Sequence, residues 1–171
     1  ERLWQAMVHE DGYAYLPDDK GAMPTGWEAV MQGMTLEMVN EFYLATGSPT
    51  ARKLGAELAR YLKDHAQVFD SEGRFLSCHE WVVGPCVHFP MNSMVSVGIA
   101  KYAAATGDEE LAAFARKSYE WARSLGSPLV GFFPEYVTQP DNPRNVNEPC
   151  STSNMMLLAL NLTQAGQGDY W

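Results

Sequence analysis

The stretches FYLATGSP at residues 42–49 and YAAATGDE at residues 102–109 decide the fold. In each, Ala-Thr-Gly is followed by a residue that caps helices, Ser48 or Asp108. Glycine ends a helix because it adopts left-handed backbone angles without strain, and serine or aspartate begins the next by accepting an N–H hydrogen bond. Pro49 suits a first helical position, where a missing N–H costs nothing. Each stretch therefore predicts two helices joined by a short turn.

The two turns belong to an internal repeat. The glycine of the first turn, Gly47, recurs as Gly107 and again as Gly166 in a third turn, Ala165-Gly166. The period is about 60 residues, a size that indicates stacked supersecondary units. Each unit is a helical hairpin with a short turn at one end and a long loop at the other. The predicted helices span residues 27–46, 49–68, 92–106, 108–125 and 152–164, after an aromatic-rich N-terminal loop with a short hairpin at 1–26.

These helices alternate in how their apolar residues are distributed. The first, third and fifth are apolar nearly all round, which predicts that they are enclosed, whereas the second and fourth carry one charged face. The pattern predicts an all-α fold with an inner and an outer layer, part of an (α/α)6 toroid built from hairpin repeats of about 60 residues. We expect residues 1–171 to be one partial toroid domain of about two and a half hairpins and a piece of a longer protein. An open solenoid of hairpins is the alternative.

The composition limits the classes of partner. Net charge is −9, with 12 basic against 21 acidic residues, so neither nucleic acid nor an anionic membrane surface is expected as the main partner. Three cysteines are too few for a disulfide framework, although a Cys78–Cys86 bridge stays open.

The long loops contain the residues that suggest chemistry, and we expect them together at the N-termini of the inner helices. Aromatic rings stack on sugar faces, and paired carboxylates act as general acid and as nucleophile or base in glycoside hydrolysis. Glu135 and Glu148 are the catalytic candidates. The candidates for substrate binding are Trp81, His79, His88, Tyr136 and Phe133. Ser151, Thr152 and Ser153 are expected to cap the helix that follows.

Structural roles compete with each of these assignments. Trp81 and the Phe132-Phe133 pair also suit loop anchors packed on helix ends, and Glu135 also suits a solvated loop acid. His79 and His88 also suit hydrogen-bonded structural positions. The pairs Cys78-His79 and Cys86-x-His88 could hold zinc, but their spacing matches no standard zinc finger.

At Glu148-Pro149-Cys150 the chain resembles the six-hairpin glycosidase group, and within it the β-L-arabinofuranosidase family of glycoside hydrolases. In that family a Glu-x-Cys supplies two zinc ligands at this point, and a glutamate upstream is the general acid/base. The resemblance implies that Glu148 and Cys150 bind zinc and that Glu135 is the acid/base. The family's adjacent downstream cysteines would lie beyond Trp171, and the spacing from Glu135 to Glu148 is shorter than the family's.

Three functions follow as expectations. The first is a glycoside hydrolase in which Glu135 protonates the leaving oxygen of a carbohydrate substrate, with Trp81 and Tyr136 stacked on sugar. The second is a lyase or sugar epimerase on the same fold, in which His79 or His88 and a tyrosine transfer protons. The third is a helical-repeat module that binds without catalysis.

Overall fold

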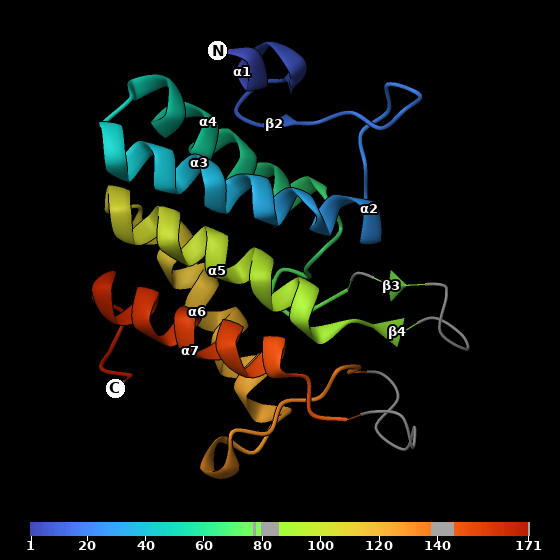
Figure 1. The fold of residues 1–171 in the computed structure, drawn as a ribbon, viewed down its shortest axis with the longest axis vertical. Coiled ribbons are helices and arrows are strands. Elements are labelled where there is room, and N and C mark those ends of the chain that lie inside the picture. Colours follow the sequence, from blue (N-terminus) through green and yellow to red (C-terminus); the bar gives the residue numbers. More distant parts are fainter. Residues whose placement is uncertain (77, 80–85, 138–145, 171) are drawn as a thin grey trace.

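The computed structural model describes residues 1–76, 78–79, 86–137 and 146–170, and these are mostly helical (Figure 1). Two short antiparallel strand pairs accompany the helices, β1 (Val8–His9) with β2 (Ala14–Tyr15) and β3 (Cys78–His79) with β4 (Cys86–Val87). The helices are α1 (Arg2–Ala6), α2 (Trp27–Val30), α3 (Gln32–Thr46), α4 (Pro49–Arg60), α5 (Phe89–Thr106), α6 (Glu109–Ser124) and α7 (Pro149–Gln164). The all-α expectation is therefore confirmed at the level of fold class.

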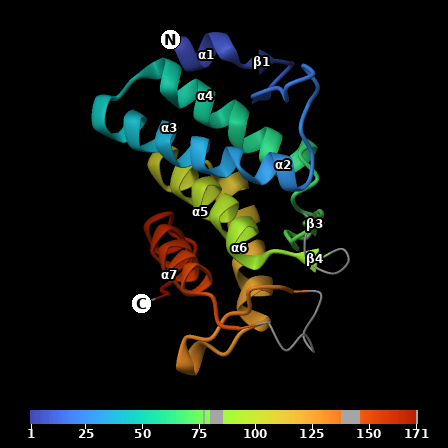
Figure 2. The same ribbon diagram turned by 45° about the vertical axis from the view of Figure 1, so that its right-hand side comes forward.

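The longer helices lie in two layers. Helices α3, α5 and α7 lie side by side in one layer, and α4 and α6 pack behind them (Figures 1 and 2). Helix α5 is central, since it contacts α3, α6 and α7 and has a smaller contact with α4. This is the separation that the alternation of apolar and amphipathic helices predicts.

The short turns have the predicted local structure. Gly47 and Gly107 adopt φ of 65° and 73° and close α3 and α5 in the left-handed region. The Ser48 side chain accepts a hydrogen bond from the Ala51 N–H, at 3.3 Å, and Asp108 accepts one from the Leu111 N–H, at 3.1 Å. The two hairpin turns are therefore closed by the same combination of a left-handed glycine and a side-chain cap.

Glycines allow α3 and α5 to approach closely. A Cβ atom on Gly33 would lie 2.8 Å from a Val95 methyl carbon, and one on Gly98 would lie 3.2 Å from Leu36. The Asn40 amide donates to the Gly98 carbonyl at 2.9 Å across the same contact. Because neither glycine can gain a side chain without movement of its neighbour, the spacing of these two helices is fixed by sequence.

Several predicted boundaries are wrong by a few residues. The helix expected at 27–46 is divided at Met31 into α2 and α3, and the one expected at 49–68 ends at Arg60 and continues as a π-helical turn, Tyr61–His65. The buried Tyr61 hydroxyl donates to the Pro24 carbonyl at 2.6 Å, a tertiary contact that the periodicity of this segment does not contain. Helices α5 and α7 both begin three residues earlier than predicted.

The caps expected for α7 are also wrong. Glu148 occupies its N-cap position, and Ser151, Thr152 and Ser153 lie inside its first turns. Their hydroxyls donate to the carbonyls of Pro134, Gly131 and Cys150. Pro149 at the first helical position starts the helix earlier than the serines would.

The N-terminal segment is more ordered than a loop. It contains α1 and the expected short hairpin, in which Val8 pairs with Tyr15 and His9 with Ala14. Both residues of β2 are buried, so the hairpin covers α4.

Full enclosure of the inner helices is confirmed only for α5. Along α3, Met31, Met34, Met38 and Phe42 are between 48% and 72% exposed, and on α7 Met156 is 63% exposed. Leu158, on the same helix, is fully buried. The difference arises because α5 has neighbours on both sides within the layer, whereas α3 and α7 are its edge helices among the described residues. None of the described helices combines the length and the apolar character that crossing a membrane requires.

Candidate functional site

A small antiparallel ribbon lies at the N-termini of α5 and α7, on the side of the long loops (Figure 1). We define the ribbon as residues 86–89, 134–137 and 146–148. His88 pairs with Tyr136 and Pro134 pairs with Asn147, both antiparallel. Backbone N–H groups of Phe89 and Val137 donate to the carbonyls of Glu135 and Val87 at 2.9 and 3.0 Å, and the Glu135 N–H donates to Val146 at 3.1 Å. Three segments that are separate in sequence are therefore held together by backbone hydrogen bonds.

The register of the ribbon indicates that its two glutamates share one face. Residues directly opposite each other in an antiparallel pair share a face, and successive residues alternate. Pro134 lies opposite Asn147, so the next residue of each segment, Glu135 and Glu148, belongs to the other face. The two are diagonal neighbours, whose Cα atoms are typically about 7–8 Å apart. Both residues are half-buried. The two catalytic candidates, which come from different segments of the chain, are thus adjacent in the ribbon.

The opposite face carries an aromatic cluster formed by Trp27, His88 and Tyr136. The ring centroids of His88 and Tyr136 lie 5.4 Å apart, and those of His88 and Trp27 lie 5.7 Å apart in an edge-to-face arrangement. All three residues are half-buried. Trp27 comes from the start of α2, and we did not predict it as a site residue. The sequence could have indicated it, because Trp27 is the first residue of the helix predicted at 27–46 and directly follows the N-terminal loop.

Phe133 takes part in the core. Its side chain is 6% exposed, and its ring stacks on that of the fully buried Phe89 at 5.7 Å. Its backbone N–H donates to the Asn147 side chain at 3.0 Å. This burial favours the anchoring role over direct contact with a sugar, because a ring enclosed by the core offers no free face.

Side chains of α7 hold this helix to α5 and to the second segment of the ribbon. The Asn154 amide donates to the Pro90 carbonyl at 2.8 Å and to the Ser93 hydroxyl at 3.1 Å. Ser151, which is fully buried, donates to the Pro134 carbonyl at 3.3 Å. These bonds join the first turns of α5 and α7 to the loop between them, so the backbone that carries Glu135 and Glu148 rests on rigid elements.

Glu148 and Cys150 are in contact. A side-chain hydrogen bond to the Glu148 carboxylate raises the pKa of the exposed Cys150 thiol above its ordinary value. The thiol is therefore kept protonated, whereas a cysteine nucleophile acts as a thiolate. None of the hydrogen bonds or ion pairs found within the described part of the chain involves the Glu135 carboxylate.

The residues present supply half of a zinc site. Zinc in proteins takes three or four protein ligands, and Glu148 with Cys150 provides one oxygen and one sulfur donor. Within the described residues no group of three or more histidine, cysteine, aspartate and glutamate side chains could hold a metal ion. The pair therefore fits part of a zinc coordination sphere.

Two of the predicted residues are only partly covered by the structure. Trp81 lies outside the described residues. His79 is described by its backbone, which pairs with Cys86, while Cys78 pairs with Val87. The structure does not describe the side chains of Cys78, His79 and Cys86, on which the suggested zinc site and disulfide depend.

Comparison with known proteins gives no relative on which to base an assignment: no family model, no curated protein and no solved structure matches this chain.

Proposed function

We propose that this chain is a glycoside hydrolase-like, carbohydrate-active protein in which Glu135 is the general acid. The observation that carries the proposal is the register of the ribbon, which brings Glu135 and Glu148 to one face of paired backbone segments. Glycosidases use two carboxyl groups on opposite sides of the scissile bond, one of which protonates the leaving oxygen. Diagonal neighbours in a ribbon have backbones about 7–8 Å apart, close enough for two glutamate side chains to reach the carboxyl separations of about 5–9.5 Å that glycosidases use.

The two glutamates take different roles in this proposal. Glu135 protonates the glycosidic oxygen as the bond to the anomeric carbon breaks. Glu148 is the second carboxylate, which activates water or attacks that carbon. Where zinc is bound, Glu148 and Cys150 would hold it, and the metal would polarise an oxygen of the substrate or water.

The arrangement of the helices supports the wider fold proposal. Helices α3, α5 and α7 lie in one layer and α4 and α6 in the other (Figure 2). In the proposed partial (α/α)6 toroid they would be the inner and the outer layer. In such a toroid the loops at the N-termini of the inner helices surround the central cleft, and the ribbon occupies that end of α5 and α7.

A lyase or epimerase is the second candidate, and the aromatic cluster favours it. The imidazole of His88 and the phenol of Tyr136 lie next to each other, and both groups can move protons. In this alternative the reacting sugar lies against the opposite face of the ribbon, and Trp27 provides the stacking surface.

The deciding experiment measures turnover of a panel of p-nitrophenyl glycosides and of neutral plant oligosaccharides by the full-length protein. Glu135→Gln should lower the hydrolysis rate by on the order of 10²–10⁴, the range for loss of general acid catalysis, with unchanged circular dichroism. Glu109→Gln, on the exposed start of α6, is the matched control and should leave the rate unchanged.

Three results would contradict the hydrolase proposal. They are no turnover of any glycoside by the unaltered full-length protein, normal turnover by its Glu135→Gln variant, or a loss of activity in Tyr136→Phe but not in Glu135→Gln. The last result, with an unsaturated or epimerised product, would support the second candidate.

A further inference from the structure

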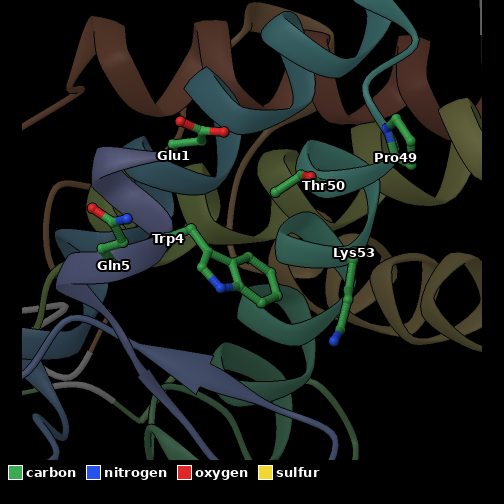
Figure 3. Close-up of a pocket in the computed structure, with 6 residues that line it drawn as sticks. All are labelled: Glu1, Trp4, Gln5, Pro49, Thr50 and Lys53. Atoms are coloured by element: carbon green, nitrogen blue, oxygen red, sulfur yellow. The ribbon is translucent and has the colours of Figure 1, made fainter.

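An open pocket of about 460 Å³ lies between α1 and the first turn of α4, away from the ribbon (Figures 1 and 3). Figure 3 shows the Trp4 indole extending from α1 toward Thr50 and Lys53 of α4. The residues that line the pocket are Glu1, Trp4, Gln5, Pro49, Thr50 and Lys53. The pocket thus combines one large aromatic ring with four polar side chains.

The Trp4 indole is supported by His9. The two rings stack with their centroids 4.0 Å apart and a 30° angle between planes. The His9 ring lies between two acceptors, since Nδ1 is 3.0 Å from the Glu57 carboxylate and Nε2 is 2.9 Å from the Trp4 carbonyl, and a neutral imidazole donates to one of them. Glu57 is only 9% exposed. A ring fixed in this way loses little conformational entropy when a ligand stacks on it, which favours binding.

The polar groups around the ring are nearly balanced in charge. The Lys53 ammonium lies 5.0 Å from the centre of the Trp4 ring and 3.6 Å from a Glu57 oxygen, so its charge already has a partner. Gln5 and Thr50 are neutral donors and acceptors, and Glu1 is an acceptor. No excess of either charge selects an ionic ligand. A planar apolar surface next to several neutral or compensated hydrogen-bonding groups suits a polyhydroxylated ring.

We propose that this pocket is a second, non-catalytic saccharide-binding site. A neutral sugar stacks one face on the Trp4 indole after the ammonium of the exposed Lys53 side chain moves off the ring, and its hydroxyl groups hydrogen-bond to Gln5, Thr50 and Lys53. The site is separate from the ribbon and does not depend on the proposed hydrolase activity, since none of its residues belongs to the ribbon.

The test is a titration of the unaltered chain with xylotetraose, cellotetraose and arabinotriose, followed by two-dimensional NMR and calorimetry. We expect at least one to bind with a dissociation constant of about 1 mM or below, with shifts of the Trp4 indole N–H resonance. Trp4→Ala should weaken this binding at least tenfold, and Gln5→Ala and Thr50→Val a few-fold each. Lys20→Met, at an exposed lysine outside the pocket, is the control and should not change it.

The outcomes separate this proposal from the catalytic one. Glu135→Gln should keep the binding while losing turnover. If Trp4→Ala releases α1, as judged from the NMR spectrum, the Gln5→Ala and Thr50→Val variants decide. The proposal is overturned if no oligosaccharide binds at 10 mM, if the pocket variants bind as the unaltered chain does, or if glucuronate binds in the pocket more tightly than the neutral sugars.

Discussion

The two ends of the helical layers are built differently. At the short-turn end, α3 and α5 each stop at a left-handed glycine, and α4 and α6 each start with a side-chain cap from the adjacent residue. At the long-loop end, the N-cap residues of α5 and α7, His88 and Glu148, make no side-chain capping bond. Backbone pairing between loop segments lies next to the first turns of these helices instead. One end is therefore determined by neighbouring residues, and the other by contacts between distant ones.

We expect the largest loss of stability when a buried aromatic side chain at the long-loop end is removed. Phe89 is fully buried at the start of α5, with its ring 5.4 Å from that of Phe75 and 5.7 Å from that of Phe133. We expect Phe89→Ala to lower the free energy of unfolding by about 3–5 kcal/mol in urea denaturation. Phe42→Ala, at a ring that is 57% exposed on α3, should change it by less than about 0.5 kcal/mol. Equal effects of the two variants would mean that the ribbon end is not anchored in the core.

Replacement of the N-cap residue by alanine should lower the free energy of unfolding at the short-turn end and hardly change it at the long-loop end. We expect Asp108→Ala to cost about 1 kcal/mol, because Asp108 accepts the Leu111 N–H, and Ser48→Ala to cost a similar amount. Glu148→Ala, at the corresponding position of α7, should cost less than about 0.5 kcal/mol, since it makes no capping bond. Asp108→Asn keeps the cap and separates this effect from the 3.8 Å ion pair with Arg60. A larger loss in Glu148→Ala than in Asp108→Ala would reverse the comparison.

The contact between Glu148 and Cys150 can be measured by the reactivity of the thiol. Glu148 raises the pKa of Cys150, so less thiolate is present at pH 7–8 than in a thiol of ordinary pKa. Glu148→Gln should therefore speed alkylation of Cys150 by iodoacetamide a few-fold near neutral pH, with the difference vanishing at high pH. Mass spectrometry of the peptides distinguishes Cys150 from Cys78 and Cys86. The same acceleration in Glu135→Gln, the matched ribbon variant, would show that the hydrogen bond from Cys150 to Glu148 is not its cause.

The smallest change in stability is expected when an ion pair in the first turn of α6 is removed. Lys63 donates to Glu110 at 3.0 Å and lowers the pKa of this carboxyl group, which is 75% exposed. A lowered carboxyl pKa stabilises the fold above the pKa of the unfolded state, and this gain is lost as the pH falls through the folded-state value. Glu110→Gln should cost only a few tenths of a kcal/mol at pH 7 and nothing at pH 2–3. Glu109→Gln is the control. An unchanged difference between the variants at both pH values would exclude the ion pair as its source.

The two ends also differ in how far sequence predicts them. The turns at Gly47 and Gly107 and the caps Ser48 and Asp108 could be read from a few adjacent letters, because each interaction joins residues that are close in sequence. The enclosure of α5 followed from its apolar composition, but the same composition could not indicate that α3 and α7 lack a neighbour on one side among the described residues.

The candidate site could be predicted only in part, because its arrangement depends on contacts between residues that are distant in sequence. Sequence identified Glu135 and Glu148 as residue types, and only the pairing of Pro134 with Asn147 places them on one face. The bond from Asn154 to Pro90 joins residues 64 positions apart, and no local pattern announces it. Pocket residues such as Trp4 and Lys53 also come from separate elements, so their proximity depends on how α1 packs on α4.

The exposed side of α3 makes this surface sensitive to oxidation. Met31, Met34 and Met38 are 48–72% exposed, whereas Met155 on α7 is 3% exposed. Peroxide reacts with accessible thioethers and turns an apolar side chain into a polar sulfoxide. One chemical step would therefore convert the edge of the helical layer from a water-excluding surface into a hydrated one while the core stays intact, and sulfoxide reductases could restore it.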